Sequence, residues 1–269
     1  MNVAQLVSEI KSKKSYLCVG LDTDITKLPE GISKDTEGIL QFNKEIINAT
    51  KDFAVSYKIN TAFYEQLGSK GWNIIEKTRE MIPSNTLSIA DAKRGDIGNT
   101  STMYAKAFFE TMDFDALTVA PYMGYDSVEP FLKFNNKITI VLGLTSNEGS
   151  ADFQTNPIYD PPLYKTVLER ISKWGTPENL MFVIGATKAE ALVKIRQIVP
   201  DHFLLIPGVG AQGGSAREVC KNGKNALGGL LINSSRGIIY ASSGRDFAEA
   251  ARAEAQKLAL ETQPYTAHL

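Results

Sequence analysis

Apolar residues along the chain follow two patterns that alternate. Short, nearly continuous apolar runs occupy residues 16–21, 53–58, 86–91, 115–119, 137–144, 180–184, 202–206 and 227–232. Such runs are typical of strands buried on both faces, as in a parallel sheet. The segments between them carry apolar residues at helical spacing, for example Val3, Leu6, Val7 and Ile10. Eight strands interleaved with helices predict a (β/α)8 TIM barrel, one domain over residues 1–269 with an additional N-terminal helix.

A doubly wound parallel sheet is the competing architecture, because periodicity alone does not separate the two. Eight β/α units and a length of 269 residues favour the closed barrel. In such barrels the active site lies where the strands end and the following loops begin. Polar residues stand at these points: Asp22, Lys58, Asp91, Lys93, Asp96, Thr145, Ser146, Ser234, Ser235 and Arg236. This distribution indicates an enzyme.

The densest charge cluster is DAKRGDI at residues 91–97, directly after the third predicted strand. While the chain is extended, alternation places Asp91 and Lys93 on one side, and Asp96 follows at the start of a predicted helix. Asp96 could instead serve only as the N-cap of that helix. Lys58 ends the neighbouring strand, so lysines and aspartates can alternate in space. Flanking carboxylates favour the ammonium form of a lysine, which suits proton donation to a carbanion and indicates decarboxylation without a cofactor.

The loop PGVGAQGG at residues 207–214 follows the seventh predicted strand. Glycines let backbone amides approach a phosphate closely, and barrels often bind phosphate with the loops after strands seven and eight. The eighth strand leads into NSSRG at residues 233–237, where Arg236 could pair with phosphate or form a surface salt bridge. Together the two loops predict a small phosphorylated substrate.

The composition limits which partners the protein can bind and which kinds of metal site or catalytic site it can contain. The 29 Lys+Arg and 30 Asp+Glu leave a formal charge of -1, so we expect neither a nucleic-acid nor a membrane partner. Cys18 and Cys220 stand far apart, which argues against a structural zinc site or a disulfide scaffold and fits a reducing, cytoplasmic location. The two histidines leave little material for a catalytic triad or a metal site. We therefore expect no metal and no cofactor.

Six motifs, in chain order, resemble the orotidine 5'-phosphate decarboxylase family, specifically its longer bacterial branch. They are GLDTD (20–24), SYKIN (56–60), DAKRGDIGNT (91–100), LTSN (144–147), PGVGAQGG (207–214) and SSRGIIYAS (234–242). The resemblance implies cofactor-independent decarboxylation of orotidine 5'-phosphate to uridine 5'-phosphate (UMP) and CO2, the last step of de novo UMP biosynthesis. It also implies a homodimer with shared active sites.

The resemblance assigns roles at the reacting end of the substrate. Asp22 and Lys58 would bind ribose hydroxyls, Asp91 would face the substrate carboxylate, and Lys93 would donate the proton to C6. Three residues would enter the site of the partner subunit: Asp96, Ile97 and Thr100.

Other residues would hold the base and the phosphate. Either Thr145 or Ser146 would contact the pyrimidine edge. The phosphate would be held by Gln212, Gly213, Gly214, Ser235 and Arg236. The segment 146–157 would form a mobile cover over the base or, alternatively, a disordered insertion.

Three other functions remain open. A keto-sugar-phosphate decarboxylase or hexulose-phosphate synthase shares D-x-K-x-x-D but uses Mg²⁺, held by a carboxylate where this chain has Lys58. A Schiff-base aldolase would use Lys58 or Lys93 as its nucleophile. A phosphate-binding barrel without catalysis would bind ligand and not turn it over.

Overall fold

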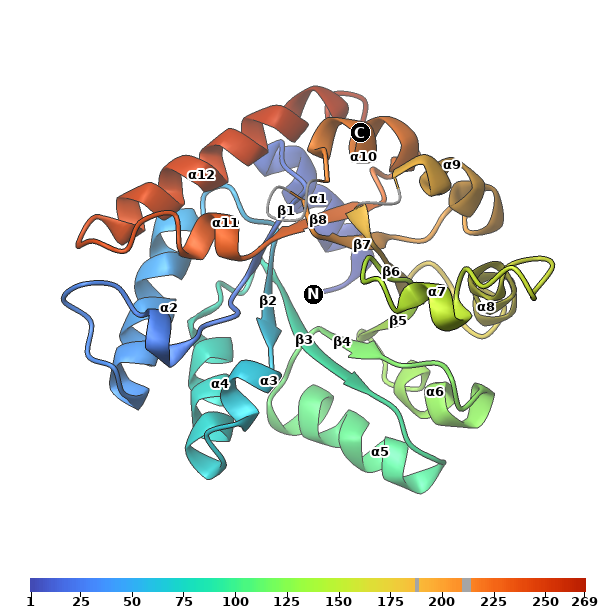
Figure 1. Ribbon diagram of the computed structural model, residues 1–269, viewed down its shortest axis with the longest axis horizontal. Coiled ribbons are helices and arrows are strands. Elements are labelled where there is room, and N and C mark those ends of the chain that lie inside the picture. The colour runs from blue at the N-terminus through green and yellow to red at the C-terminus, as the bar shows by residue number, and fades with distance from the viewer. Residues whose placement is uncertain (187–188, 210–213) are drawn as a thin grey trace.

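The computed structural model describes residues 1–186, 189–209 and 214–269, and its central feature is a closed parallel β-barrel with helices around it (Figure 1). The strands follow one another around the barrel in chain order: β1 (Leu17–Gly20), β2 (Ser56–Asn60), β3 (Leu87–Arg94), β4 (Ala116–Val119), β5 (Ile138–Leu144), β6 (Leu180–Ile184), β7 (Leu204–Pro207) and β8 (Leu230–Ser234). β8 pairs with β1, with Ile232 opposite Leu17, and this pairing closes the barrel. The TIM barrel is confirmed, and the doubly wound alternative is wrong.

Helices cover the outside of the barrel. In chain order they are α1 (Val3–Lys13), α2 (Thr36–Thr50), α3 (Ala62–Glu65), α4 (Ser69–Met81), α5 (Asn99–Lys106) with the π-helical turn η2 (Ala107–Thr111), α6 (Tyr125–Leu132), α7 (Ser150–Phe153), α8 (Leu163–Ile171), α9 (Ala189–Ile198), α10 (Ala216–Gly223), α11 (Arg236–Ile239) and α12 (Phe247–Thr262); η1 (Ile25–Lys27) and η4 (Gln263–Tyr265) are 3-10 turns. Helix α1 is the expected additional N-terminal helix. A capping box between Asn2 and Gln5 starts it, and its apolar positions are buried. Within the described residues, no helix combines the length and apolar character that crossing a membrane requires.

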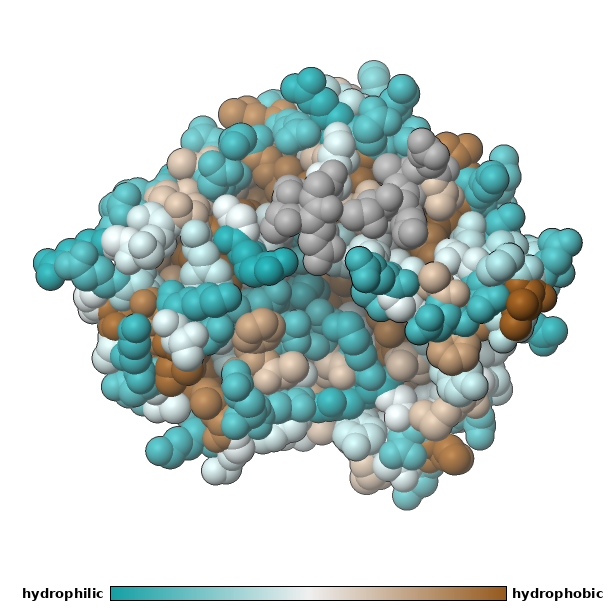
Figure 2. All heavy atoms as spheres, viewed as in Figure 1, coloured by the Kyte–Doolittle hydropathy of each residue, from teal (hydrophilic) through white to brown (hydrophobic). Residues whose placement is uncertain are grey.

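The strands are buried on both faces, because apolar side chains project from both the inner and the outer face of the barrel. All five residues of β6 are buried, as the unbroken run LMFVI predicts. The third strand extends beyond the predicted end at residue 91, because Arg94 pairs with Val119 after an irregularity in the β3–β4 register. The face seen in Figure 2 is hollowed near its centre, and hydrophilic side chains make up part of the surface in and beside the hollow.

Candidate active site

Three neighbouring strand ends bring four charged side chains together in a row. Asp22 follows β1, Lys58 lies in β2, and Asp91 and Lys93 lie in β3. Lys58 Nζ is 2.9 Å from Asp91 Oδ2 and 3.6 Å from Asp22 Oδ1. Lys93 Nζ donates to Asp91 Oδ1 at 2.6 Å. The charges therefore alternate as Asp22, Lys58, Asp91 and Lys93, and we call these four residues the charge array.

Burial and charge act in opposite directions on the centre of the charge array. The Lys58 side chain is only 5% exposed, and its burial alone lowers the pKa of the ammonium group. The carboxylates of Asp91 and Asp22 outweigh that effect and raise the pKa of Lys58 above its usual range. Burial likewise raises the pKa of Asp91, but Lys58 and Lys93 outweigh it and hold that pKa well below its usual value. Both groups therefore stay charged at neutral pH.

A bulge in β3 aims Asp91 and Lys93 at the same point. Ala90 pairs with Leu117 and Arg94 pairs with Val119. The stretch of β3 between these two pairs therefore contains more residues than the stretch of β4 opposite it, which is a β-bulge. Lys93 has φ +47°, a left-handed conformation that non-glycine residues rarely adopt. The two side chains thus do meet, but the regular alternation expected from the sequence is wrong here, because the chain is not uniformly extended.

Thr118 supports the bulge and was missed by sequence reasoning. Its hydroxyl donates to Asp91 Oδ1 at 3.0 Å and accepts from the Lys93 amide at 2.9 Å. The signal was its position at the end of the fourth predicted strand, where functional side chains are expected in a barrel. Thr118 fixes the carboxylate and the backbone of the lysine at once.

Asp22 presents a buried oxygen that has no hydrogen-bond donor among the described residues. This atom is Oδ1, which lies 3.6 Å from the Lys58 ammonium nitrogen. A buried acceptor without a donor is costly, so it is suited to receive a hydroxyl from a ligand. The position fits the ribose-binding role that the resemblance implies.

A cavity of about 240 Å³ lies beside the charge array. It extends from Lys58, Asp91 and Lys93 to the loop after β5, and the remaining lining residues are Leu142, Thr145, Ser146, Asn147, Val183, Leu205 and Pro207. Its lining is therefore charged at β2 and β3, apolar at Leu142, Val183, Leu205 and Pro207, and polar at the loop residues Thr145, Ser146 and Asn147. A concave pocket with apolar walls and a few polar groups is typical of a site for a small molecule.

The loop after β5 is ordered by hydrogen bonds of its own. Helix α7 lies within it, and the Gln154 side chain bonds to both the amide and the hydroxyl of Thr145. The alternative of a disordered insertion over 146–157 is therefore wrong, while a cover over the base stays a prediction.

The expected phosphate region lies at the ends of β7 and β8. Gln212 and Gly213 fall outside the described residues. Gly214 pairs with Val209 in an isolated bridge, and Arg236 is exposed at the first residue of α11. Ser235 packs tightly against β1, since a Cβ at Gly20 would come within 1.9 Å of the Ser235 hydroxyl.

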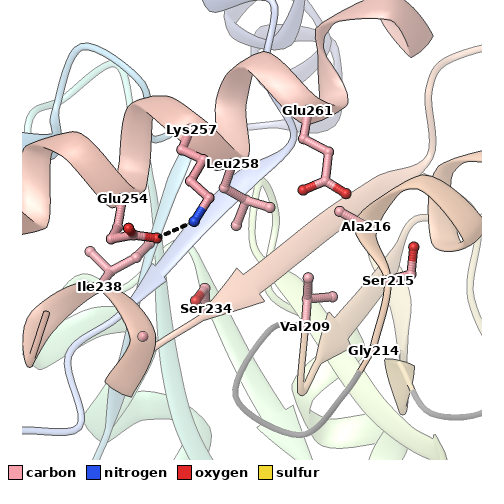
Figure 3. Close-up of a pocket in the computed structure, with 11 residues that line it drawn as sticks. Val209, Gly214, Ser215, Ala216, Ser234, Ile238, Glu254, Lys257, Leu258 and Glu261 are labelled. Atoms are coloured by element: carbon pink, nitrogen blue, oxygen red, sulfur yellow. Dashed lines mark hydrogen bonds and ion pairs between the residues drawn. The ribbon is translucent and has the colours of Figure 1, made fainter.

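A second cavity, of about 370 Å³, lies behind this region, between the ends of β7 and β8 and helix α12 (Figure 3). Val209, Gly214 and Ser234 line one side. On α12, Lys257 pairs with Glu254 at 3.3 Å, as the dashed line shows. None of the four residues of the charge array lines this cavity.

The structure does not bring Asp96, Ile97 and Thr100 into the charge array of their own chain. Asp96 Oδ1 accepts from the Ile97 amide, and the amide of Asp96 donates to Ser101 Oγ. The alternative that Asp96 caps the helix is wrong, because the N-cap of α5 is Gly98. Ile97 is 64% exposed, and Thr100 is exposed as well.

Exposed apolar side chains occur just before α5, on α5, in the loop before α6 and at the first residue of α6. We call this set the α5–α6 surface; its members are Ile97, Met103, Tyr104, Tyr122, Met123 and Tyr125. Helices α5 and α6 are packed together, with Ser101 Oγ donating to the carbonyl of Ser127. Large exposed apolar patches are more typical of interaction surfaces than of the rest of a protein surface.

Comparison with known proteins gives one consistent family. The model of the "Orotidine 5'-phosphate decarboxylase / HUMPS family" matches residues 15–253. Orotidine 5'-phosphate decarboxylase of Flavobacterium johnsoniae is 59% identical over 264 residues, covering 97% of this chain and 97% of that protein. The protein of the same name from Phocaeicola vulgatus is 55% identical, covering 96% of each. The structure of Leishmania donovani OMP decarboxylase superposes with a TM-score of 0.82 at 35% identity, covering 97% of this chain and 100% of that one.

Proposed function

The chain belongs to the orotidine 5'-phosphate decarboxylase / HUMPS family, and we propose that its charge array is the catalytic centre, with Lys93 as the proton donor. The protein is a carboxy-lyase that decarboxylates orotidine 5'-phosphate in pyrimidine biosynthesis. The observation that carries the proposed mechanism is the contact of Lys93 Nζ with Asp91 Oδ1 at 2.6 Å. It puts an ammonium group and a fixed carboxylate at the same point of the cavity.

The reaction needs one proton and no electron acceptor. The bond between C6 and the carboxylate breaks, its electron pair stays on C6, and CO2 leaves. Lys93 donates a proton from Nζ to C6, and the neutral amine then regains a proton from solvent. Asp91 faces the departing carboxylate and disfavours it relative to the transition state, in which that charge disperses. Lys58 keeps Asp91 ionised throughout.

The ribose, the base and the phosphate of the substrate bind at the ends of different strands. Asp22 and Lys58 bind the ribose hydroxyls, which is supported by the buried Asp22 oxygen for which the described residues provide no donor. The loop residues Thr145 and Ser146 border the space for the base. The phosphate group binds at the ends of β7 and β8, through Gln212, Gly213, Gly214, Ser235 and Arg236.

Two alternative chemistries fit the charge array poorly. Mg²⁺ would have to lie between carboxylates, but the Lys58 ammonium occupies that space, 2.9 Å from Asp91 and 3.6 Å from Asp22. A Schiff-base lysine must lose its proton before it attacks a carbonyl. Asp91 and Asp22 oppose the loss of that proton from Lys58, because their carboxylates raise its pKa although burial lowers it.

We further propose that the protein acts as a homodimer in which Asp96, Ile97 and Thr100 complete the site of the partner subunit. The exposure of Ile97 and the other members of the α5–α6 surface supports this, because a second copy docked there would cover apolar area. A cytoplasmic location agrees with a biosynthetic enzyme whose two cysteines are buried free thiols.

An absorbance assay tests the reaction. Purified protein mixed with orotidine 5'-phosphate in chelator should convert the orotate chromophore to that of UMP. A requirement for added Mg²⁺ would contradict the cofactor-free mechanism.

Mixed dimers test the shared site. Lys93→Ala and Asp96→Ala homodimers should each be severely impaired. With random exchange, half of the dimers carry both lesions in one site and leave the other intact, so about a quarter of all sites should regain wild-type turnover. If mass spectrometry shows exchange and activity stays at the level of the separate variants, Asp96 acts within its own subunit.

A further inference from the structure

Arg94 follows Lys93 in the motif DAKRGDI, and its side chain contacts three elements outside the charge array. Its guanidinium group forms an ion pair with Glu65, the last residue of α3. The same group lies over the rings of Tyr104 and Phe108, with its central carbon 5.5 Å from each ring centroid. Tyr104 lies on α5, and Phe108 lies on η2, which continues that helix. Arg94 thus links the end of β3 to α3 and to α5.

The structure on both sides of the guanidinium group is anchored in the core. Phe108 is fully buried and packs against Phe114, with ring centroids 6.2 Å apart. On the other side, Tyr64 precedes Glu65 and is also fully buried. The Arg94 side chain is 20% exposed, so its attraction to the aromatic rings acts largely out of contact with water, where it is stronger. Arg94 therefore holds α5 against parts of the molecule that are themselves fixed.

The segment from Asp96 to Thr100 takes its position from α5. Ser101 Oγ, on that helix, accepts from the Asp96 amide at 3.1 Å and donates to the Asp96 carbonyl at 2.7 Å. Gly98, the N-cap of α5, has no side chain with which to cap the helix. A displacement of α5 would therefore move Asp96 with it.

The position of Lys93, by contrast, does not depend on the Arg94 side chain. Thr118 Oγ1 accepts from the Lys93 amide, and Lys93 Nζ donates to Asp91. Arg94 contributes to this end of β3 through its backbone, because its carbonyl accepts from the Ala120 amide at 2.8 Å. A substitution that changes only the side chain of Arg94 leaves all of these donors and acceptors in place.

We propose that Arg94 is a positioning residue for the site of the partner subunit: it fixes α5, and α5 fixes the Asp96 segment that enters that site. The inference rests on the proposed function, because it assumes a homodimer with shared sites. Arg94 acts through α5 and not by contact with the substrate. Its loss should therefore impair the site that receives Asp96 from the altered chain, and spare the site that uses the neighbouring Lys93.

Heterodimers isolated through two different affinity tags separate these two sites. In a dimer of Arg94→Met with Lys93→Ala, the site that keeps its lysine combines Lys93 of the Arg94→Met chain with Asp96 of the other chain. In a dimer of Arg94→Met with Asp96→Ala, the complete site takes Asp96 from the Arg94→Met chain and Lys93 from the other chain. The same dimers with a wild-type chain in place of Arg94→Met give the reference turnover, measured by loss of the orotate absorbance.

The two heterodimers should differ. Turnover of the dimer with Asp96→Ala should fall about tenfold or more below its reference, and that of the dimer with Lys93→Ala should stay within about twofold, since a displaced group slows only the site that contains it. Glu65→Gln, which keeps the shape of Glu65 without its charge, should cause a smaller loss in the same heterodimer. Arg94→Lys keeps the charge but not the planar group, so it should fall between wild type and Arg94→Met.

Arg79→Met is a matched control at the opposite end of the barrel. The Arg79 side chain is 18% exposed, and its guanidinium group binds Asp113 in the loop before β4. Arg79 thus resembles Arg94 in exposure and in pairing with a neighbouring element, but it lies far from the loops that follow the strands. Arg79→Met should leave both heterodimers at their reference turnover.

Three outcomes overturn the inference. An equal loss in both heterodimers would reduce Arg94 to general support of the fold, and a loss confined to the dimer with Lys93→Ala would make it a support of its own lysine. Reference turnover in both would leave its contacts without effect on catalysis. If Arg94→Met does not fold, Arg94→Lys and Glu65→Gln carry the same comparison.

Failure of the proposed function gives a different result. If the dimer of Lys93→Ala with Asp96→Ala is inactive while wild-type protein decarboxylates orotidine 5'-phosphate, the shared site is wrong and this inference is wrong with it. If that dimer is active, the Arg94 heterodimers decide the inference alone. Wild-type protein that does not decarboxylate orotidine 5'-phosphate would contradict the proposed function itself.

Discussion

Replacing Asp91 by Asn removes the central negative charge of the charge array while keeping its shape. The Asp91 carboxylate accepts from three donors: Lys58 and Thr118 at 2.9 and 3.0 Å, and Lys93 at 2.6 Å. An Asn side chain offers one acceptor oxygen, and its NH2 group must point at one of the two lysines. In either orientation the NH2 group of the Asn faces the ammonium group of a lysine, so two hydrogen-bond donors oppose each other.

The cost follows from the burial of Lys58. Its side chain is 5% exposed, and removing one partner of a buried ion pair costs about 3–5 kcal/mol. Asp22 remains 3.6 Å away and still neutralises part of the charge, so we expect the lower end, about 3 kcal/mol. For a protein of this size, about 2–4 °C is lost per kcal/mol, which gives a fall in melting temperature of about 6–12 °C.

Thermal and urea unfolding followed by circular dichroism measure this loss. Lys58→Met serves as the matched second variant, because Met keeps the length of the lysine stem without its charge. In a double-mutant cycle, Lys58→Met should cost about 2 kcal/mol less in the Asp91→Asn background than in wild type, since the buried charge it removes is then poorly paired. A melting temperature of Asp91→Asn within about 2 °C of wild type, or additive single effects, would refute the account of Lys58 and Asp91 as a coupled buried pair.

Three further predictions follow from single residues. Lys93→Ala should reduce turnover by about 10²–10⁴-fold or more, with UMP affinity within a few-fold of wild type in calorimetry; near-native turnover would exclude Lys93 as the proton donor. Arg236→Ala should weaken and slow the reaction of orotidine 5'-phosphate, while free orotidine reacts about equally slowly with both proteins; an equal loss for orotidine would assign Arg236 another role. His202 is buried, and its burial is the main cause that lowers the pKa of its imidazole. The unfolded chain therefore binds a proton at this residue more readily than the folded chain does. Stability should therefore decrease as pH falls below about 6.5, and His202→Leu should flatten the melting temperature between about pH 7 and 5; an unchanged slope would show that other groups cause it.

Much of the architecture can be predicted from the pattern of apolar and polar residues along the sequence. Residues 180–184 are apolar without interruption, which favours a strand covered on both faces, as in a parallel sheet with outer helices. Repetition of that pattern, with polar residues such as Lys58 and Asp91 at strand ends, predicts one face of a barrel as the candidate site. These are local properties, because each depends on neighbours within a few residues.

The geometry of the site was decided by tertiary contacts. Regular alternation does not predict the left-handed backbone of Lys93, which is stabilised by Thr118 from the next strand. Nor does sequence spacing predict the two hydrogen bonds that hold Thr145, since they come from the side chain of Gln154, nine residues away and beyond α7. The charged state of Lys58 likewise depends on a balance between burial and two carboxylates from other strands. Each of these features arises from residues that only the closed barrel and its loops bring within a few ångströms. The sequence therefore predicts Lys58, Asp91 and Lys93 as candidates, but not the contacts that Thr118 and Gln154 add.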